Sequence, residues 1–102
     1  MVYNIIISSD AYLDMNETSD WYDNQLKGLG VDFVLEFYEE ANYLSENAMA
    51  HVFLIEPVRK KLMKKFPYAI YYSIIHHRNE VLIEAVWHQK RSPDRLRVRL
   101  KK

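Results

Sequence analysis

The spacing of apolar residues changes near residue 50, and this change limits the folds that the chain can adopt. Before residue 50 apolar residues recur at helical intervals, with one stripe at Val34, Phe37, Ala41 and Leu44. After it, apolar and polar residues alternate, as in strands that bury one face. The 102 residues therefore predict one domain, residues 1–102, of the α+β class.

The first half predicts a strand followed by two helices. Val2–Ser8 is short, β-branched and aromatic, which favours a strand, and helices are expected at residues 10–26 and 30–47. Both glycines of the chain lie in Gly28-Leu29-Gly30, where glycine's access to positive φ suits a sharp turn. The two helices should therefore form an antiparallel hairpin. The acids expected to face water on the second helix are Glu36, Glu39, Glu40 and Glu46.

The second half predicts a mainly antiparallel sheet. Strands are expected at residues 58–66, 68–75 and 81–88, joined by short turns, which gives the order β-α-α-β-β-β. The helical hairpin should cover one face of the sheet and leave the other face free. The residues expected to share one face of the first of these strands are Val58, Leu62 and Phe66. Those expected to share one face of the last strand are Val81, Ile83, Ala85 and Trp87.

Charge is divided unevenly along the chain. Residues 1–57 hold one base, Lys27, and eleven acids, a balance of −10. Residues 58–102 hold thirteen bases and three acids, a balance of +10. This asymmetry favours an anionic partner for the basic half. An acidic helical layer that neutralises a basic sheet within one fold explains it equally well, and both explanations can hold together.

Several short phrases, in this order, resemble the RelE/ParE toxin superfamily, and most of all its ParE-like branch, often described as plasmid stabilisation proteins. The likeness covers residues 2–99. The phrases are Trp21-Tyr22, Gly28-Leu29-Gly30 with Phe33, Val58-Arg59, Phe66-Pro67-Tyr68-Ala69-Ile70-Tyr71-Tyr72 and Val86-Trp87-His88-Gln89-Lys90-Arg91-Ser92-Pro93.

The resemblance implies the toxin of a bacterial type II toxin–antitoxin module, silenced by a cognate antitoxin protein. ParE-like members poison DNA gyrase, whereas RelE-like members are mRNA interferases, which cut mRNA in the ribosome. RelE-like nucleases typically have a tyrosine near the carboxyl terminus, and the last tyrosine here is Tyr72. We therefore expect gyrase poisoning, with ribosome-dependent mRNA cleavage as the first alternative and a non-toxic binding module of the same fold as the second.

A nuclease would need His88, Arg91, Arg59 and Lys61. A histidine side chain exchanges protons near neutral pH, and arginine and lysine stabilise the charge of a phosphorane. Glu84 would share a face with His88 and orient it. Each of three candidates also has a structural interpretation: His88 ends a strand and bonds to backbone, Arg91 is a solvated charge, and Arg59 bridges to an acid of the helical layer.

Other cations and aromatic residues extend the candidate surface. The residues expected to bind a nucleic acid or protein target are Arg59, Lys61, Lys64, Lys65, Lys90, Arg91 and Arg95. The residues considered for stacking on bases, at least half of which should be core, are Tyr68, Tyr71, Tyr72 and Trp87. Trp21 and Tyr22 are expected in the core.

The sequence favours no cofactor and no metal. It has no cysteine, and the adjacent His76 and His77 have no cluster of further ligands beside them. It offers no signal peptide and no apolar segment near the roughly 20 residues of a membrane span, so no membrane association and a cytoplasmic location are expected.

Overall fold

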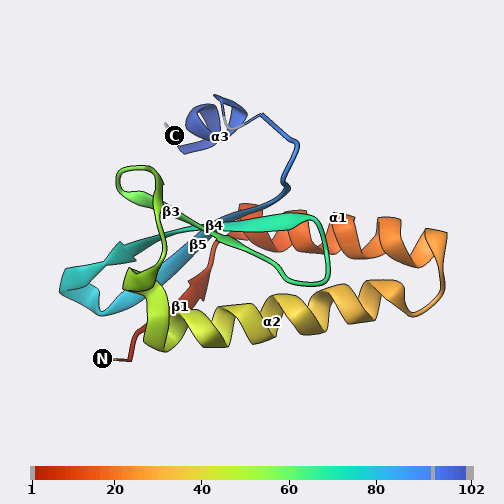
Figure 1. The fold of residues 1–102 in the computed structure, drawn as a ribbon, viewed down its shortest axis with the longest axis horizontal. Helices are drawn as coiled ribbons and strands as arrows, with labels where there is room; N and C mark the ends of the chain where they lie inside the picture. The colour runs from red at the N-terminus through yellow and green to blue at the C-terminus, as the bar shows by residue number, and fades with distance from the viewer. Residues whose placement is uncertain (1, 93, 101–102) are drawn as a thin grey trace.

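A five-stranded sheet lies between a pair of long helices and a short carboxyl-terminal helix in the computed structural model (Figure 1). The structure describes residues 2–92 and 94–100; Met1, Pro93, Lys101 and Lys102 lie outside the described residues. The elements are β1 (Asn4–Ile7), α1 (Ser9–Gln25), α2 (Leu29–Asn47), the 3-10 turn η1 (Ala48–Ala50), β2 (Phe53–Ile55), β3 (Val58–Leu62), β4 (Tyr68–Ile75), the 3-10 turn η2 (His76–Arg78), β5 (Glu80–His88) and α3 (Asp94–Leu100). No helix within the described residues is long and apolar enough to cross a membrane.

The sheet has the strand order β1-β5-β4-β3-β2. β1 runs parallel to β5, with Ile5 opposite Val81, and every other neighbouring pair is antiparallel. The expected α+β fold and mainly antiparallel sheet are therefore confirmed. The short edge strand β2 was not predicted, since its three residues are bounded by a turn and carry no alternating pattern.

The predicted helical hairpin forms at the glycines. Ser8 caps α1 by accepting a hydrogen bond from the Ala11 amide at 3.1 Å. Gly28 has a φ of 93°. Gly30, two residues later, lies so close to α1 that a Cβ there would overlap the Ser19 carbonyl oxygen. The Asp23 carboxylate accepts hydrogen bonds from the amides of both glycines, at 3.1 and 2.8 Å. The turn and the close approach of the helices thus require glycine for different reasons.

The main core lies between this hairpin and the sheet. Phe33 and Phe37 of α2 are fully buried against Ile70 and Ile83 of the sheet. Tyr72 is also fully buried, and its hydroxyl donates to the Ala48 carbonyl oxygen at 2.6 Å. Burial raises the pKa of Tyr72 to about 12, so this hydroxyl remains a donor throughout the ordinary pH range.

Two of the four glutamates expected to face water are buried instead. Glu36 and Glu40 are each 4% exposed. Glu36 accepts hydrogen bonds from the backbone amides of Lys64 and Lys65 at 2.6 and 3.0 Å, and Glu40 pairs with Lys61 at 2.6 Å. The prediction was wrong for these residues because the β3–β4 turn supplies partners that helical periodicity cannot indicate.

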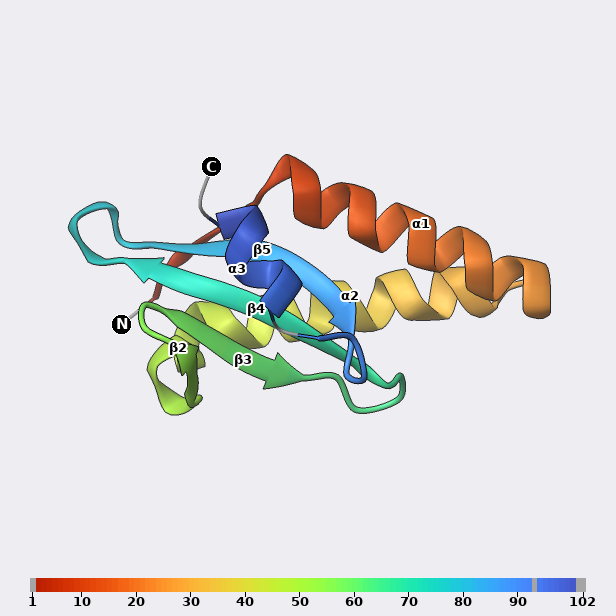
Figure 2. The ribbon, with the colours of Figure 1, turned by 90° about the horizontal axis from the view of Figure 1, so that it is seen from above.

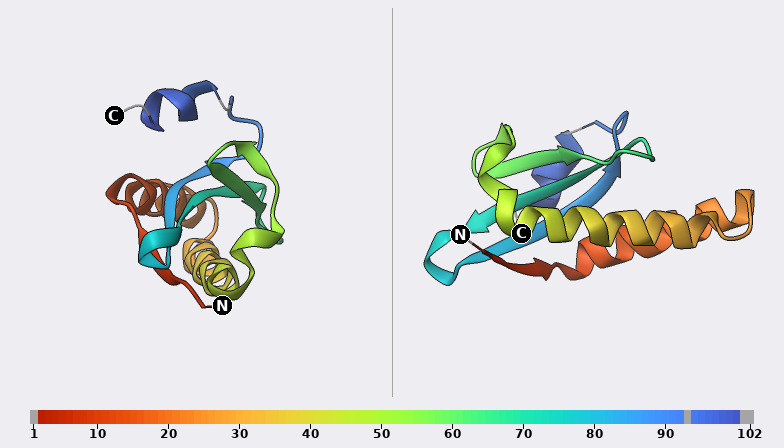
Figure 3. Two further views of the ribbon diagram at one scale, coloured as in Figure 1. Left: turned by 90° about the vertical axis from the view of Figure 1, so that its left-hand side faces the viewer. Right: turned by 60° about the horizontal axis from the view of Figure 1, so that its bottom comes forward.

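The second face of the sheet is covered, contrary to the expectation of a free face. In Figure 2, α3 lies across β4 and β5, and Figure 3 shows it on the side opposite the hairpin. Leu96 of α3 is fully buried (0% exposed), and it packs over this face. The second core consists of Val58, Ala69, Tyr71, Ala85, Trp87 and Leu96, with Leu54 and Leu100 beside them. The sequence predicted no element here, because the seven-residue helix contains three arginines and offers only a short apolar stripe.

Asp14 of α1 fastens α3 to the sheet. Its carboxylate forms a bidentate ion pair with the Arg99 guanidinium, at 2.7 and 3.0 Å. It also accepts a hydrogen bond from the Val86 amide at 3.1 Å, beyond the point where β1 ends opposite Ile83. One carboxylate therefore closes the edge of β5 and anchors the last helix.

A β-bulge in β5 overturns the predicted sharing of faces. Tyr72 lies opposite Ile83 and Tyr71 lies opposite Ala85, so Glu84 is an extra residue. Val81 and Ile83 therefore point into the main core, whereas Ala85 and Trp87 point into the second core.

The predicted face of residues 58–66 was also wrong. The strand ends at Leu62, where the prediction extended it to residue 66. Val58 belongs to the second core, Phe66 belongs to the main core, and Leu62 is exposed. The chain turns after Leu62, so the alternation of side chains does not continue to Phe66.

The close approach of the helices at Gly30 predicts a large cost for a methyl group there. Gly30→Ala should lower the free energy of unfolding by about 1–3 kcal/mol, because α1 must shift away from the Ser19 carbonyl. Urea unfolding followed by circular dichroism measures this loss. Gly28→Asn is the matched control, because no atom lies within 4 Å of a Cβ there and asparagine tolerates positive φ. A loss for Gly28→Asn equal to that for Gly30→Ala would contradict this account.

The buried Glu36 carboxylate predicts a second loss of stability. Glu36→Ala should lower the free energy of unfolding by on the order of 2 kcal/mol, because two backbone amides of the β3–β4 turn lose a charged acceptor. Urea unfolding followed by circular dichroism measures this loss as well. Glu46→Ala, on the exposed side of α2, should change it little, and similar losses for both variants would contradict a specific role of Glu36.

Candidate functional site

His88 lies at the carboxyl end of β5, beside the β3–β4 turn. Its ring packs edge-on against Tyr68, with 5.2 Å between the ring centres, and its Nδ1 accepts a hydrogen bond from the Lys90 amide at 3.1 Å. The histidine is half-buried at one wall of a cavity of about 450 Å³. The residues that line this cavity are Trp21, Tyr22, Pro67, Tyr68 and His88.

Trp21 was expected in the core, but it is 56% exposed at this cavity. Tyr22 is half-buried and stacks on Phe33 in the main core, with 5.7 Å between ring centres. The helical stripe therefore includes Tyr22, and its neighbour Trp21 points outward. Because adjacent helical residues lie about 100° apart, both could not face the core equally.

Arg91 lies close to His88. Its guanidinium is 3.7 Å from the centre of the Trp87 ring, and its backbone amide donates to the His88 carbonyl oxygen at 3.0 Å. Both residues border a smaller depression of about 130 Å³, together with Asp14 and Glu17 of α1. The structure thus brings these two candidates together.

Arg59 and Lys61 share a strand face, as predicted, but they are directed to the helical layer. Arg59 donates to the backbone carbonyl oxygens of His51 and Met49, at 2.6 and 3.3 Å, so it bridges to this layer through backbone and not through an acid. Lys61 is bound by Glu40. In the sheet register Lys61 lies opposite Ile70, which lies opposite Val86, so Lys61 is two strands away from β5. The structure therefore does not bring Arg59 and Lys61 to His88 and Arg91.

Glu84 does not share a face with His88, and that expectation was wrong. The bulge turns Glu84 to the side of Ala85 and Trp87, whereas His88 follows the opposite phase beside Tyr68. The carboxylate lies beside Val58 and Leu100 in another cavity. It cannot orient the imidazole from there.

The remaining candidate cations are exposed. Lys64 and Lys65 lie on the β3–β4 turn, and Lys90 follows β5. These segments adjoin one another, because the Gln89 amide donates to the Pro67 carbonyl oxygen at 2.9 Å. We call Lys64, Lys65, Lys90 and Arg91 the basic end of the sheet. Arg95 is exposed on α3.

Most of the aromatic residues considered for base stacking belong to the interior. Tyr71, Tyr72 and Trp87 are at most 2% exposed, which leaves Tyr68 as the half-buried ring beside His88. The expectation that at least half of these residues are core is confirmed.

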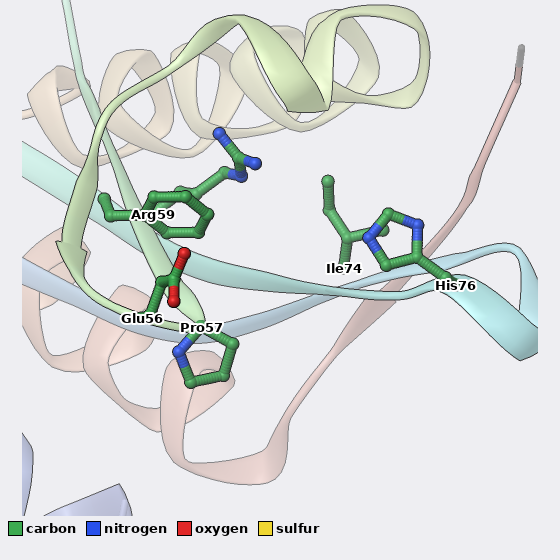
Figure 4. A pocket seen from close by; sticks show the side chains of 6 residues that line it. Glu56, Pro57, Arg59, Ile74 and His76 are labelled. Atoms are coloured by element: carbon green, nitrogen blue, oxygen red, sulfur yellow. The ribbon is translucent and has the colours of Figure 1, made fainter.

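A second polar cavity, not predicted, surrounds Arg59. It has a volume of about 370 Å³. Figure 4 shows Glu56, Pro57 and Arg59 from the β2–β3 hairpin on one side of it, and Ile74 and His76 from β4 and the following turn on the other. Glu56 and His76 are 20 residues apart in sequence, so only the pairing of β3 with β4 brings them together. No group of three or more histidine, cysteine or acidic side chains within the described residues could hold a metal ion.

His51 and Tyr43 form another pair that sequence reasoning missed. The His51 Nε2 lies 2.9 Å from the Tyr43 hydroxyl. Burial lowers the pKa of His51, and the nearby Lys61 lowers it further. The contact joins the segment between η1 and β2 to α2.

Comparison with known proteins identifies the fold. The sequence matches no protein-family model. No curated protein sequence matches it significantly either. Among solved structures, the chain is similar to one from the chromosomal ParDE toxin–antitoxin system of P. aeruginosa, with a TM-score of 0.75 and 14% identity over 85% of this chain and 96% of the other. It is also similar to a chain of the toxin–antitoxin complex RelBE2 from Mycobacterium tuberculosis, with a TM-score of 0.56 and 18% identity over 86% of this chain and 99% of the other.

Both similarities extend over most of each chain and agree with the order of elements found here. They confirm, at the level of the fold, the resemblance that the sequence phrases indicated. The chain therefore has the same fold as these two chains from toxin–antitoxin structures.

Proposed function

We propose that this protein is the toxin of a toxin–antitoxin pair and that it acts as ParE-like toxins do, by binding and poisoning DNA gyrase. The observation that carries the proposal is the similarity to the chain of the ParDE system, with a TM-score of 0.75 over 96% of that chain. The similarity to the RelBE2 chain is lower, with a TM-score of 0.56. Fold similarity alone does not fix a target, so the side chains supply the second argument.

The arrangement of the candidate nuclease residues supports an inhibitor that is not itself an enzyme. Cleavage of RNA needs proton donors and acceptors and a cation around one phosphate. Lys61 is neutralised by Glu40, and Arg59 is hydrogen-bonded to backbone carbonyls. Of the four candidate nuclease residues, only His88 and Arg91 then remain close together, and no tyrosine follows them in the sequence.

Ribosome-dependent mRNA cleavage is the second candidate function. It is favoured by one observation, the depression of about 130 Å³ that both His88 and Arg91 border. A histidine next to a stacked arginine can exchange a proton and hold a phosphate. The third candidate, a non-toxic binding module, requires only the fold.

The gyrase proposal predicts inhibition of supercoiling that depends on the basic end. Purified, antitoxin-free protein should inhibit gyrase and trap cleaved DNA. The double variant Lys90→Glu/Arg91→Glu should need at least about tenfold more protein for the same inhibition, because two exposed cations that attract an anionic surface are reversed. A supercoiling assay with a DNA-cleavage readout measures both effects.

Arg78→Glu is the matched control, since Arg78 is exposed on the β4–β5 turn at the opposite end of the sheet. Folded protein that leaves gyrase unaffected would contradict the proposal. If new 5′ ends then appear within translated codons and His88→Ala abolishes them, the protein is a nuclease. Harmless expression without either effect would identify a binding module.

A toxin of this kind predicts a cognate antitoxin with an acidic or amphipathic segment. The two proteins should co-purify when expressed from their native operon, and raising the salt concentration should weaken their association, because the basic end is solvent-exposed and its charges are screened. Size-exclusion chromatography at two ionic strengths measures this. Recovery of the toxin alone under gentle, low-salt conditions would contradict it.

A further inference from the structure

A cavity of about 450 Å³ lies between α3 and the β2–β3 hairpin, away from the basic end. Its walls are largely apolar, and its polar side chains are two acids and one base. The lining residues are Ile55, Glu56, Pro57, Val58, Glu84, Arg97 and Leu100. The rest of the basic half attracts anions, whereas this cavity has more acidic than basic side chains and therefore suits a cationic ligand.

The polar centre of the cavity is the Glu84 carboxylate. The β-bulge points Glu84 toward α3, and its Oε2 is buried with no hydrogen-bond partner among the described residues. Burial raises the pKa of Glu84. A buried carboxylate oxygen without a donor is costly, so this cavity favours a ligand that supplies one.

The neighbouring arginines are directed elsewhere. Arg99 hydrogen-bonds to Asp14 and, at 3.4 Å, to the backbone carbonyl of Glu84. Arg97 lies at the rim and is exposed to solvent. Glu56 adds a second negative charge to the lining.

We propose that this cavity receives an arginine side chain of a partner polypeptide. The methylene stem would lie against Ile55, Pro57 and Leu100, and the guanidinium would donate hydrogen bonds to the Glu84 carboxylate. Arginine suits the site better than lysine, because its planar fork matches the two oxygens of a carboxylate. If the protein is a toxin, as proposed above, this partner polypeptide is the antitoxin; the identification of the partner rests on that proposed function.

The test uses a probe that requires neither an antitoxin nor gyrase. N-acetyl-arginine methylamide is titrated into the full-length protein, and binding is followed by amide NMR resonances. Shifts should be confined to the cavity and include those of Val58, Glu84 and Leu100. N-acetyl-citrulline methylamide, the neutral isostere, should bind at least about tenfold more weakly, because it lacks the charge that strengthens the hydrogen bonds.

Substitutions in the cavity test whether the arginine probe binds there. Glu84→Gln should weaken binding of the arginine probe by at least about tenfold, whereas Glu46→Gln, the same change on the exposed side of α2, should not alter it. Arg97→Gln should strengthen binding, because a like charge leaves the rim. Equal affinity for the arginine and citrulline probes, or no effect of Glu84→Gln, would overturn the proposal.

The titration of Glu84 gives an independent readout. Its carboxyl pKa, measured by carbon NMR, should lie above the usual value in the free protein and fall when the probe is added. The folded state holds this proton more tightly than the unfolded chain, so the contribution to stability is present at low pH and lost as pH rises through the raised pKa. Glu84→Gln should accordingly be more stable than the natural chain near neutral pH.

A Glu84 pKa at or below the usual value in the free protein would mean that Arg97 already fills the site, and would overturn the proposal. Failure of the probe to bind leaves gyrase inhibition untouched. If the protein does not inhibit gyrase but binds the arginine probe as expected, gyrase is ruled out as the target and the arginine site is still supported. The two results are therefore distinguishable.

Discussion

The Asp14 carboxylate joins three elements that lie far apart in the sequence. It continues the hydrogen bonding of β5 where β1 ends, by accepting from Val86, and it pairs with Arg99 of α3. Hydrogen bonds to an ionised acceptor are stronger than those between neutral groups, and the bidentate guanidinium pair also fixes the geometry. The same carboxylate therefore links α1 both to the edge strand segment of β5 and to α3, the helix that covers the second core.

The uneven charge of the chain has a structural use. Glu40 of the helical layer pairs with the Lys61 ammonium, and Glu36 accepts hydrogen bonds from backbone amides of the β3–β4 turn. This pairing removes Lys61 from the surface but leaves Lys64, Lys65, Lys90 and Arg91 exposed together at one end of the sheet. One base is thus neutralised inside the fold while others form a basic outer surface. This basic surface contains fewer residues than the number of bases in the sequence suggests.

The sequence predicted the elements that have long, regular patterns. The two helices and the strands β4 and β5 were predicted correctly because each repeats its pattern over two or more turns or several residues, and the two glycines indicated the turn between the helices. The bulge at Glu84, the short helix α3 and the burial of Glu36 were missed, because each depends on contacts with distant parts of the chain. The candidate site was predicted in part: His88 and Arg91 meet, while Arg59 and Lys61 are held two strands away.

The bulge also determines which changes of length the chain can accept. β5 contributes Val81 and Ile83 to one core and Ala85 and Trp87 to the other, and Glu84 is the single residue that separates the two phases. Deleting or inserting one residue within this strand would exchange, beyond that point, the side chains that face the main core with those that face the second core. Gains and losses of residues during divergence should thus accumulate in the turn at His76–Asn79 and spare the strand that follows it.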